Sequence, residues 1–342
     1  MMYIYPYKFT PIYKEKIWGG RNLERLFRRR LPPGNVGESW ELADLDEGAT
    51  TVANGPLAGT SITALTRSLG DKLLGNARTA GDGRFPLLLK LLDANDTLSL
   101  QVHPDEQAVG EIGPSAALKT ECWYVLESRE GFIYKGIRPG VAAEQFRQAW
   151  QSDRAVDVVR RIDVRAEDFH YLPAGTVHAL GSGLVVAEVQ TPSDTTYRVT
   201  DWGRGREIHL ERSLQCIRPE LTGDDAPGAG GDVLLATEYF IVARRTLSTA
   251  QEAKLPPGKC VAIMMLHGEA KLIHSGEVEP SVSLSAGDTV LVPAALCGTG
   301  ILPVCPTAVP AVEASQSRVE TTLRRMDKMS MPRYLEVTLP EK

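Results

Sequence analysis

Short apolar runs separated by glycine and proline set the main limit on what this chain can fold into. The 342 residues include 31 glycines and 22 prolines, and these residues interrupt the apolar runs after seven to ten residues. Runs of that length, rich in valine, isoleucine, leucine and tyrosine, are typical of β-strands joined by turns. The clearest examples are 85–94, 97–103, 122–128, 131–137, 168–174, 183–190, 239–247, 260–268 and 288–294. The sequence therefore predicts a mainly β protein, built as barrels or sandwiches.

Helical periodicity is confined to a few segments. In residues 141–162, apolar side chains recur at close to helical spacing, which predicts a small helical insert between strands. Weaker patterns at 61–75 and 212–218 predict two further short helices, which we expect to cover faces of the β structure. Helices are therefore expected to be few.

A stretch rich in glycine, proline and aspartate, LTGDDAPGAGGD at 221–232, has no periodicity and is the expected linker. It divides the chain into residues 1–220, which include the helical insert, and residues 233–342. A short internal sequence repeat indicates that the two parts are related. Segments 166–183 and 286–301, offset by 120 residues, both run from an acidic residue through alternating apolar residues to a proline.

The two copies of this repeat differ at the position where the first has a histidine. His178 follows the proline of the first copy, whereas Cys297 and Gly298 stand near the matching position of the second. We therefore expect a metal ligand in the first copy alone, and a C-terminal part without a metal site.

Composition narrows the class of function. The formal net charge of -5 supplies no broad positive field, so nucleic acid is not expected as a partner. Prolines and lysines interrupt the first 20 residues, and no later run approaches ~18 apolar residues, so neither a secretory leader nor a membrane partner is expected. Five scattered cysteines without a C-x-x-C pair suit a reducing compartment. We expect a cytoplasmic protein.

Four polar residues in three strand-like runs could form one metal site. Gln101 and His103 lie two residues apart and so point to the same side of their strand. Glu121 begins a second run, and His178 follows a Pro-Ala-Gly turn after a third. Two imidazoles, one carboxylate and one amide make a set that zinc accepts, with a position left for water or substrate. Spacing leaves an alternative open, in which the histidines are hydrogen-bonded core residues and the glutamate is a solvated strand end.

A further group of acids and cations follows His178. In the strand-like run 183–190, alternation places Glu188 on the same face as Gln190. A Thr-Pro-Ser-Asp turn that ends in Asp194 then leads to Arg198 and Arg204. An arginine here could hold negative charge that develops on a substrate oxygen, and a second cation could hold a phosphate. The alternative is a surface loop with ordinary ion pairs, which contribute little to stability.

Three common catalytic signatures are absent from the sequence. There is no G-x-x-x-x-G-K-[ST] phosphate loop, no G-x-S-x-G nucleophile elbow, and no glycine-rich turn in the βαβ context that a dinucleotide fold requires. Phosphoryl transfer by a P-loop and acyl transfer by an activated serine are therefore not expected.

Several motifs in one fixed order carry a resemblance to a known family. They are KIWGG (16–20), GESWELAD (37–44), VANGPLAG (52–59), FPLLLKLLDANDTLSLQVHPDE (85–106), KTECWYVL (119–126), LPAGTVHALGSG (172–183) and EVQTPSDTTYRVTDWGR (188–204). In these motifs the sequence resembles the type I mannose-6-phosphate isomerases, also called phosphomannose isomerases, particularly their short bacterial form. The resemblance covers most of the first 220 residues.

The resemblance implies a fold of two cupin (jelly-roll) barrels with a helical insert, and one Zn²⁺ per chain. The zinc ligands that it implies are His103, Glu121 and His178, and Gln101 matches a further ligand of the longer fungal-type members. The barrel formed by the C-terminal part would carry no metal.

The resemblance also implies roles for residues around the metal. The catalytic arginine of the family falls on Arg198, and Lys90 and Ser99 match positions that line the substrate pocket of the longer relatives. Asp194 is expected beside the substrate. Arg204 stands where those relatives carry a lysine, a departure that puts its role in phosphate binding in doubt.

The implied activity is a zinc-dependent aldose-ketose isomerisation between D-mannose 6-phosphate and D-fructose 6-phosphate, through an enediol or enediolate. The candidate bases are Glu188, which strand alternation favours, Asp194, a histidine and a metal-bound water. Two alternatives are a non-catalytic sugar-binding cupin and another metal-dependent cupin enzyme. An oxygenase of that kind would usually have a second histidine where Gln101 stands. The oligomeric state is left open.

Overall fold

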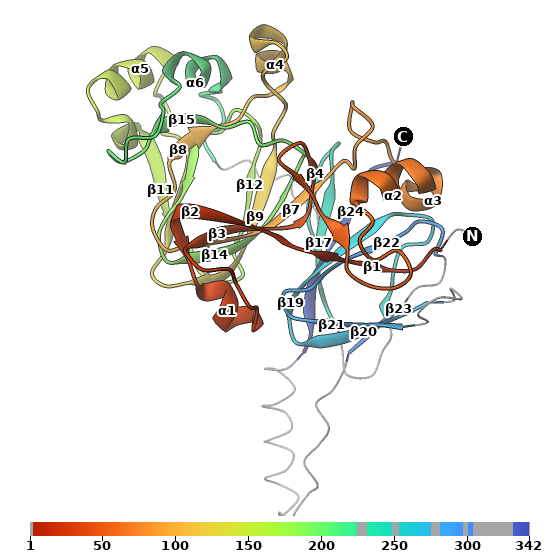
Figure 1. Cartoon of the computed structure of the whole chain (residues 1–342). Coiled ribbons are helices and arrows are strands. Elements are labelled where there is room, and N and C mark those ends of the chain that lie inside the picture. The colour runs from red at the N-terminus through yellow and green to blue at the C-terminus, as the bar shows by residue number, and fades with distance from the viewer. Residues whose placement is uncertain are drawn as a thin grey trace, which may run out of the picture. The chain divides into compact units, whose positions relative to one another are not determined.

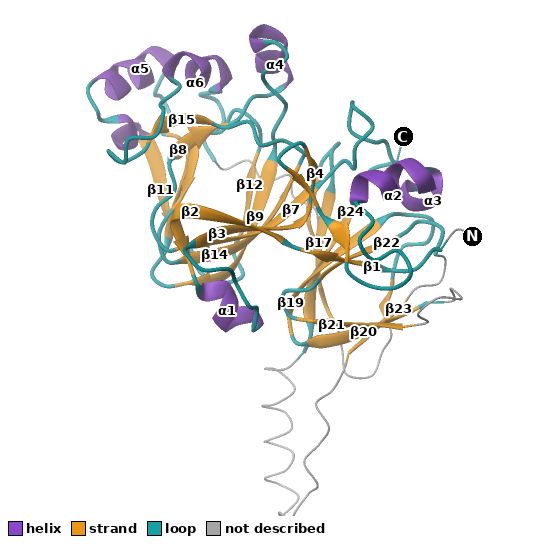
Figure 2. Ribbon diagram, in the orientation of Figure 1, coloured by secondary structure: helices purple, strands orange, loops and turns teal. Residues whose placement is uncertain are grey.

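The computed structural model describes residues 3–223, 231–247, 253–274, 281–296, 300–303 and 331–341. These residues form a mainly β structure with few helices (Figure 2), as expected. The chain divides into two compact units, which are described separately. Unit 1 comprises Met1–Thr10, Thr51–Gly83 and Gly228–Lys342, and unit 2 comprises Pro11–Thr50 and Arg84–Pro227.

Unit 2 contains two antiparallel sheets and a short two-stranded one. The strands of the first sheet are β2 (Ile12–Gly20), β3 (Val36–Leu42), β7 (Leu88–Ala94), β9 (Glu121–Ser128), β12 (Phe169–Leu172) and β14 (Leu184–Gln190). The strands of the second sheet are β8 (Leu100–Val102), β10 (Phe132–Ile137), β11 (Val159–Asp163), β13 (His178–Leu180) and β15 (Tyr197–Thr200). A separate pair is formed by β4 (Asp44–Leu45) and β5 (Gly48–Ala49). The spatial orders are β12-β9-β14-β7-β3-β2 and β11-β10-β13-β8-β15.

Unit 1 also contains two antiparallel sheets. The larger has strands β1 (Tyr7–Thr10), β6 (Thr51–Val52), β16 (Val233–Ala236), β17 (Ile241–Thr246), β19 (Val261–His267), β22 (Thr289–Val292) and β24 (Arg333–Thr338). The smaller has β18 (Ala253–Lys254), β20 (Glu269–Ile273), β21 (Ser281–Ser285) and β23 (Gly300–Pro303). Their orders are β16-β17-β24-β19-β22-β1-β6 and β18-β23-β20-β21. Figure 1 labels most of the strands of both units.

Both units contain the same jelly-roll topology. In unit 2, β7 to β14 pair as β12-β9-β14-β7 and β11-β10-β13-β8, the two interleaved four-stranded sheets of a jelly roll. In unit 1, β17 to β24 pair in the same pattern, as β22-β19-β24-β17 and β21-β20-β23-β18. The expected two barrels are confirmed. The sequence repeat also has a structural counterpart. Strands β12 and β22 occupy equivalent places in the two jelly rolls and begin 120 residues apart, at 169 and 289.

The helical segments of the whole described chain are α1 (Asn22–Phe27), α2 (Ile62–Leu69), α3 (Asp71–Leu74), α4 (Glu106–Ile112), α5 (Ala143–Gln151), the 3₁₀ helix η1 (Ala155–Val158) and α6 (Leu210–Cys216). Three helices of unit 2, α4, α5 and α6, cover the outer face of its five-stranded sheet (Figure 1). Leu100 and Val102 of β8 pack with Phe146 of α5 and Cys216 of α6 in one buried cluster. The side chain between these two strand residues, Gln101, therefore faces the other way, into the jelly roll.

The units do not follow a single boundary in the chain. Residues 1–10 and 51–83 belong to unit 1 because β1 pairs with β22 and with β6, in registers such as Tyr7 with Leu291 and Phe9 with Val52. The expected division into 1–220 and 233–342 places these two segments in the N-terminal part instead. Of the expected linker, residues 224–230 lie outside the described residues, as do Cys297 and Gly298.

The expected helical insert is shorter than 141–162. Its helical residues end at Val158, and Val159–Asp163 form β11, an edge strand paired with β10. Val159 is buried and the residues after it alternate in exposure, which is a strand pattern. The helices expected at 61–75 and 212–218 are present as α2 with α3 and as α6.

In the described part of the chain, no helix is long and apolar enough to cross a membrane. The cytoplasmic location expected from the sequence stays a prediction.

A glycine of the KIWGG motif provides a test of the packing in unit 2. A Cβ atom on Gly19 would lie 2.4 Å from the backbone nitrogen of Gly37 and 2.6 Å from the carbonyl carbon of Val36. Because backbone atoms cannot move aside cheaply, we expect Gly19→Ala to lower the free energy of unfolding by about 1–3 kcal/mol. Urea denaturation measures this. The matched control is Gly110→Ala in α4, where the new methyl group meets no atom within 4 Å and should be neutral or slightly stabilising.

Candidate metal centre and catalytic cavity

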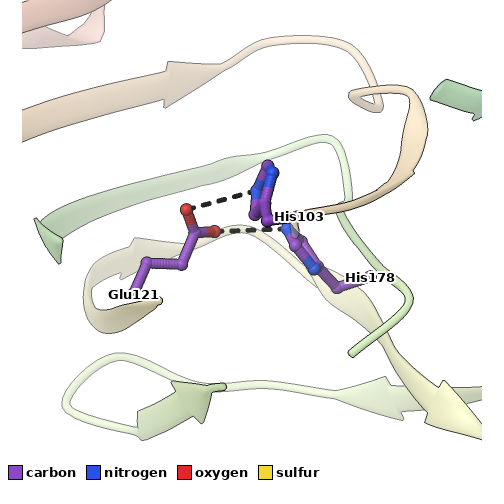
Figure 3. Close-up of side chains that lie close together, drawn as sticks. All are labelled: His103, Glu121 and His178. Carbon is purple, nitrogen blue, oxygen red and sulfur yellow. Dashed lines mark ion pairs between the residues drawn. The ribbon is translucent and has the colours of Figure 1, made fainter. Parts of the chain in front are cut away.

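His103, Glu121 and His178 converge inside the jelly roll of unit 2 (Figure 3). Glu121 is the first residue of β9, His178 is the first residue of β13, and His103 directly follows β8. Nε2 of His103 lies 3.4 Å from Oε2 of Glu121, and Nε2 of His178 lies 3.2 Å from Oε1. Each of the three residues is 1% exposed. The structure therefore brings together the three ligands that the sequence resemblance implies.

Backbone carbonyls determine which nitrogen of each imidazole carries the proton. Nδ1 of His103 lies 3.0 Å from the carbonyl oxygen of Thr195, and Nδ1 of His178 lies 2.9 Å from that of Thr176. A carbonyl oxygen only accepts hydrogen bonds, so each Nδ1 donates and each Nε2 presents a lone pair. This is the outer hydrogen bond that orients histidine ligands in metal sites.

The lone pairs of both imidazoles thus face the oxygens of a carboxylate. Nε2 of His103 and both carboxylate oxygens of Glu121 are buried without a hydrogen-bond partner. Buried polar atoms without partners are costly, and acceptors that face one another repel. A cation among the three residues would satisfy all of these atoms. The set of two imidazoles and one carboxylate fits zinc and leaves positions for a further ligand and substrate.

The protonation states also suit a metal. Burial lowers the pKa of His103 to about 3, and the ammonium of Lys119 acts in the same direction. Burial alone would raise the pKa of Glu121. The ammonium of Lys119, 3.4 Å from Oε2, opposes this, and the pKa of Glu121 lies well below its usual range. A neutral imidazole and an ionised carboxylate are the forms that bind metals.

Strand register places Gln101 beside the three ligands. In the five-stranded sheet Gln101 of β8 lies directly opposite His178 of β13 on one side and Arg198 of β15 on the other. Residues paired in this way point to the same face of a sheet. The amide nitrogen Nε2 of Gln101 is 3.3 Å from Nε2 of His178. Rotating the amide by half a turn would present its oxygen there instead.

The six-stranded sheet contributes a second inward row of side chains. Trp123, Glu188, Lys90 and Trp40 are successive register partners across β9, β14, β7 and β3. Nζ of Lys90 lies 3.1 Å from Oε1 of Glu188, and the indole nitrogen of Trp123 donates to Oε2 at 2.8 Å. Burial raises the pKa of Glu188, and the nearby Glu121 raises it further, while Lys90 and Lys119 oppose the shift.

A cavity of about 140 Å³ holds most of the expected site residues. Its lining includes Lys90, Ser99, Gln101, Glu188, Asp194 and Arg198. Ser99 also donates a hydrogen bond to Oε1 of Gln101, at 3.3 Å. Arg204 is the one expected substrate residue that does not line the cavity. Its guanidinium is held by Asp201, at 2.9 Å, and faces Asp96, at 3.4 Å.

Five further charged or aromatic residues line the cavity that sequence reasoning did not single out. They are Lys16, Trp18, Glu38, Lys119 and Arg206. The first two belong to the KIWGG motif, and Lys119 stands two residues before Glu121, so alternation could have placed it on the ligand side. No such pattern marks Arg206, because it lies in a turn beyond β15.

Comparison with known proteins decides the family. A model of the phosphomannose isomerase type I catalytic domain matches residues 7–131. The chain is 33% identical over 309 residues to mannose-6-phosphate isomerase ManA of Bacillus subtilis, a match that covers 84% of this chain and 93% of that protein. The chain belongs to the type I phosphomannose isomerases. It is also 32% identical over 295 residues to the mannose-6-phosphate isomerase of Streptococcus mutans, covering 82% of this chain and 89% of that protein.

Solved structures agree with this family membership. The crystal structure of the mannose 6-phosphate isomerase from Bacillus subtilis superposes with a TM-score of 0.78 at 28% identity, over 97% of this chain and 99% of that one. A mutant of the phosphomannose isomerase from Salmonella typhimurium shares the fold with a TM-score of 0.74 at 16% identity, over 98% of this chain and 100% of that one. The two-barrel fold is therefore shared by phosphomannose isomerases of low sequence identity.

The buried His103 makes the stability of the metal-free protein depend on pH. Its pKa is about 3 when folded and 6.5 in the unfolded chain, so below pH 6.5 the unfolded state binds the extra proton and stability falls as pH falls. From pH 7 to pH 5 this residue should account for a loss of about 2 kcal/mol. Urea denaturation with a chelator present measures it. His103→Gln should remove this part of the pH dependence. If the variant and the wild type lose equal stability between pH 7 and pH 5, His103 is not the residue responsible.

Proposed function

We propose that this protein is a mannose-6-phosphate isomerase that uses one zinc ion per chain to interconvert D-mannose 6-phosphate and D-fructose 6-phosphate. The observation that carries the proposal is the buried set of His103, Glu121 and His178, whose unsatisfied acceptor atoms adjoin a small cationic cavity. Relatives at 32–33% identity bear the name of this activity. The substrate is thus an open-chain phosphosugar.

The metal is the proposed electrophile. A bound zinc would supply Lewis-acid chemistry that polarises the sugar carbonyl. His103, Glu121 and His178 would hold it, and Gln101 is the proposed fourth ligand through its amide oxygen. The hydroxyl of Ser99 and the carboxylate of Asp194 line the same cavity and would position the hydroxyl groups of the substrate.

Isomerisation requires a base that moves one proton between C1 and C2. We assign this role to Glu188. Trp123 donates a hydrogen bond to its Oε2, while Oε1 accepts no hydrogen bond and is the proposed proton acceptor. The ammonium of Lys90, 3.1 Å from Oε1, favours the ionised form that a base requires. Asp194 and Lys119 line the cavity too and are the other groups that could carry the proton.

Arg198 would stabilise the negative charge of the enediolate. Its register partner is Gln101, so its strand carries it along the row that begins at His178. Its Nε atom is buried without a hydrogen-bond partner, and burial lowers its pKa, with a contribution from Arg206. A guanidinium with a free donor beside the proposed metal site is well placed to bind an oxyanion.

The first test measures turnover and metal together. Purified protein should convert mannose 6-phosphate to fructose 6-phosphate, lose the activity with a chelator and regain it with zinc. His178→Gln should lose bound zinc, measured by elemental analysis, whereas the exposed His267 can be replaced by glutamine without effect. Zinc-loaded protein without turnover would favour a non-catalytic sugar-binding role, and activity with iron and oxygen but not zinc would favour the oxygenase alternative.

The second test separates the roles of Arg198 and Glu188. Arg198→Gln should lower kcat by about 10²–10³ with a smaller change in KM, because its hydrogen bonds strengthen as charge develops. Glu188→Gln should abolish exchange of the C2 proton of the substrate with deuterium from solvent, measured by NMR, while zinc content is unchanged. If Asp194→Asn abolishes the exchange and Glu188→Gln does not, the base is Asp194.

A further inference from the structure

The chain turns back after β15 and returns a second arginine to the cavity. Within 201–205, Trp202 and two glycines have φ values of 56°, 75° and 81°, which reverse the direction of the backbone. The returning segment is tied to the strand by two hydrogen bonds, from the His209 amide to the Arg198 carbonyl at 2.9 Å and from the Arg198 amide to Nδ1 of His209 at 3.1 Å. Arg206 lies three residues before this attachment and lines the cavity beside Arg198.

Asp201 holds Arg206 in a defined orientation. This carboxylate is 3% exposed and accepts hydrogen bonds from Nε of Arg206 at 2.9 Å and from Nη2. Arg204 binds the same carboxylate, at 2.9 Å. Within the described part of the chain Nη1 of Arg206 makes no hydrogen bond, so one amino group of a fixed guanidinium stays available.

The lysines of the cavity are neutralised by neighbouring carboxylates. Lys16 lies 2.8 Å from Glu38. Lys90 lies 3.1 Å from Glu188, and Lys119 lies 3.4 Å from the metal-ligand carboxylate. Lys16 and Lys90 therefore add little net positive charge for an anionic ligand, whereas Lys119 shares its carboxylate with the proposed metal.

The two arginines differ from the lysines in this respect. Among the described residues Arg198 forms no ion pair with a carboxylate, and Arg206 shares its single partner, Asp201, with Arg204. Asp194, which lines the cavity, and the exposed Glu207 also act on Arg198, but among the described residues neither forms an ion pair with Arg198 or Arg206. Both guanidiniums therefore keep hydrogen-bond donors for an anion such as a phosphate monoester, which carries about 1.5 to 2 negative charges at pH 7.

Building on the proposed function, we propose that Arg206 binds the phosphate group of the substrate and that Asp201 is its positioning residue. Arg204 balances the charge of Asp201 from outside the cavity and does not contact the phosphate. A guanidinium already held in place loses little conformational freedom on binding, which favours affinity. This assignment replaces Arg204, the arginine that the sequence resemblance indicates for this position.

The test compares Arg206→Gln with its matched control Arg204→Gln. Both remove one arginine from Asp201, but only the first removes a cation from the cavity. For Arg206→Gln we expect KM for mannose 6-phosphate to rise about tenfold or more with kcat within about threefold, because binding to ground state and transition state is lost equally. For Arg204→Gln we expect KM within about threefold of wild type. Thermal unfolding and zinc content show whether each variant is folded and loaded.

A second readout uses inorganic phosphate as a competitive inhibitor. Its inhibition constant should rise in Arg206→Gln by a factor similar to that of KM, stay unchanged in Arg204→Gln, and be partly restored in Arg206→Lys. Asp201→Asn should raise KM while zinc content stays the same. A larger effect of Arg204→Gln than of Arg206→Gln, or no effect of either, would overturn the inference.

The activity of the wild-type protein shows whether the proposed function fails independently of this inference. Absence of turnover with mannose 6-phosphate would reject the isomerase assignment alone. Calorimetric titration of the zinc-loaded protein with inorganic phosphate would then still test Arg206. Weaker binding in Arg206→Gln than in wild type and Arg204→Gln supports the anion site, and equal binding in all three rejects it.

Discussion

The buried carboxylate of Glu121 between two imidazole lone pairs is the constraint on which the site depends. Its oxygens lie 3.2 and 3.4 Å from the Nε2 atoms of His178 and His103, and the carbonyls of Thr176 and Thr195 keep the protons on the opposite nitrogens. Without a cation this arrangement leaves buried acceptors facing one another. The nearby Lys119 lowers the pKa of both Glu121 and His103, which keeps the set ready for a metal.

The jelly roll explains how residues distant in the sequence reach this centre. Its five-stranded sheet aligns His178, Gln101 and Arg198 as register partners, and its six-stranded sheet aligns Glu188 with Lys90. Two facing sheets thus present a candidate metal site, a proposed base and a cationic group toward one interior. The outer face of the five-stranded sheet is apolar and covered by helices, so the polar side chains of that sheet are directed inward.

The same topology occurs twice, but the two interiors differ. The interior cluster of unit 1 is built from apolar side chains of both of its sheets, including Val261, Met265, Leu272 and Val290. In unit 2 the interior includes the metal-ligand set and charged rows. The shared strand order and the 120-residue offset between β12 and β22 are what duplication of one jelly roll would leave. Both described interiors contain a packed apolar cluster, and the interior of unit 2 contains a polar site as well.

Motifs and alternation within single strands determined much of this protein: its β class, its family, and His103, Glu121 and His178 as candidate ligands. Tertiary structure alone decided which of Arg204 and Arg206 faces the cavity, and that residues 1–10 and 51–83 join unit 1. The physical reason is the range of each signal. Periodicity shows which side of its own strand a residue occupies, whereas a turn with three left-handed residues, or a pairing such as Tyr7 with Leu291, depends on contacts with distant parts of the chain.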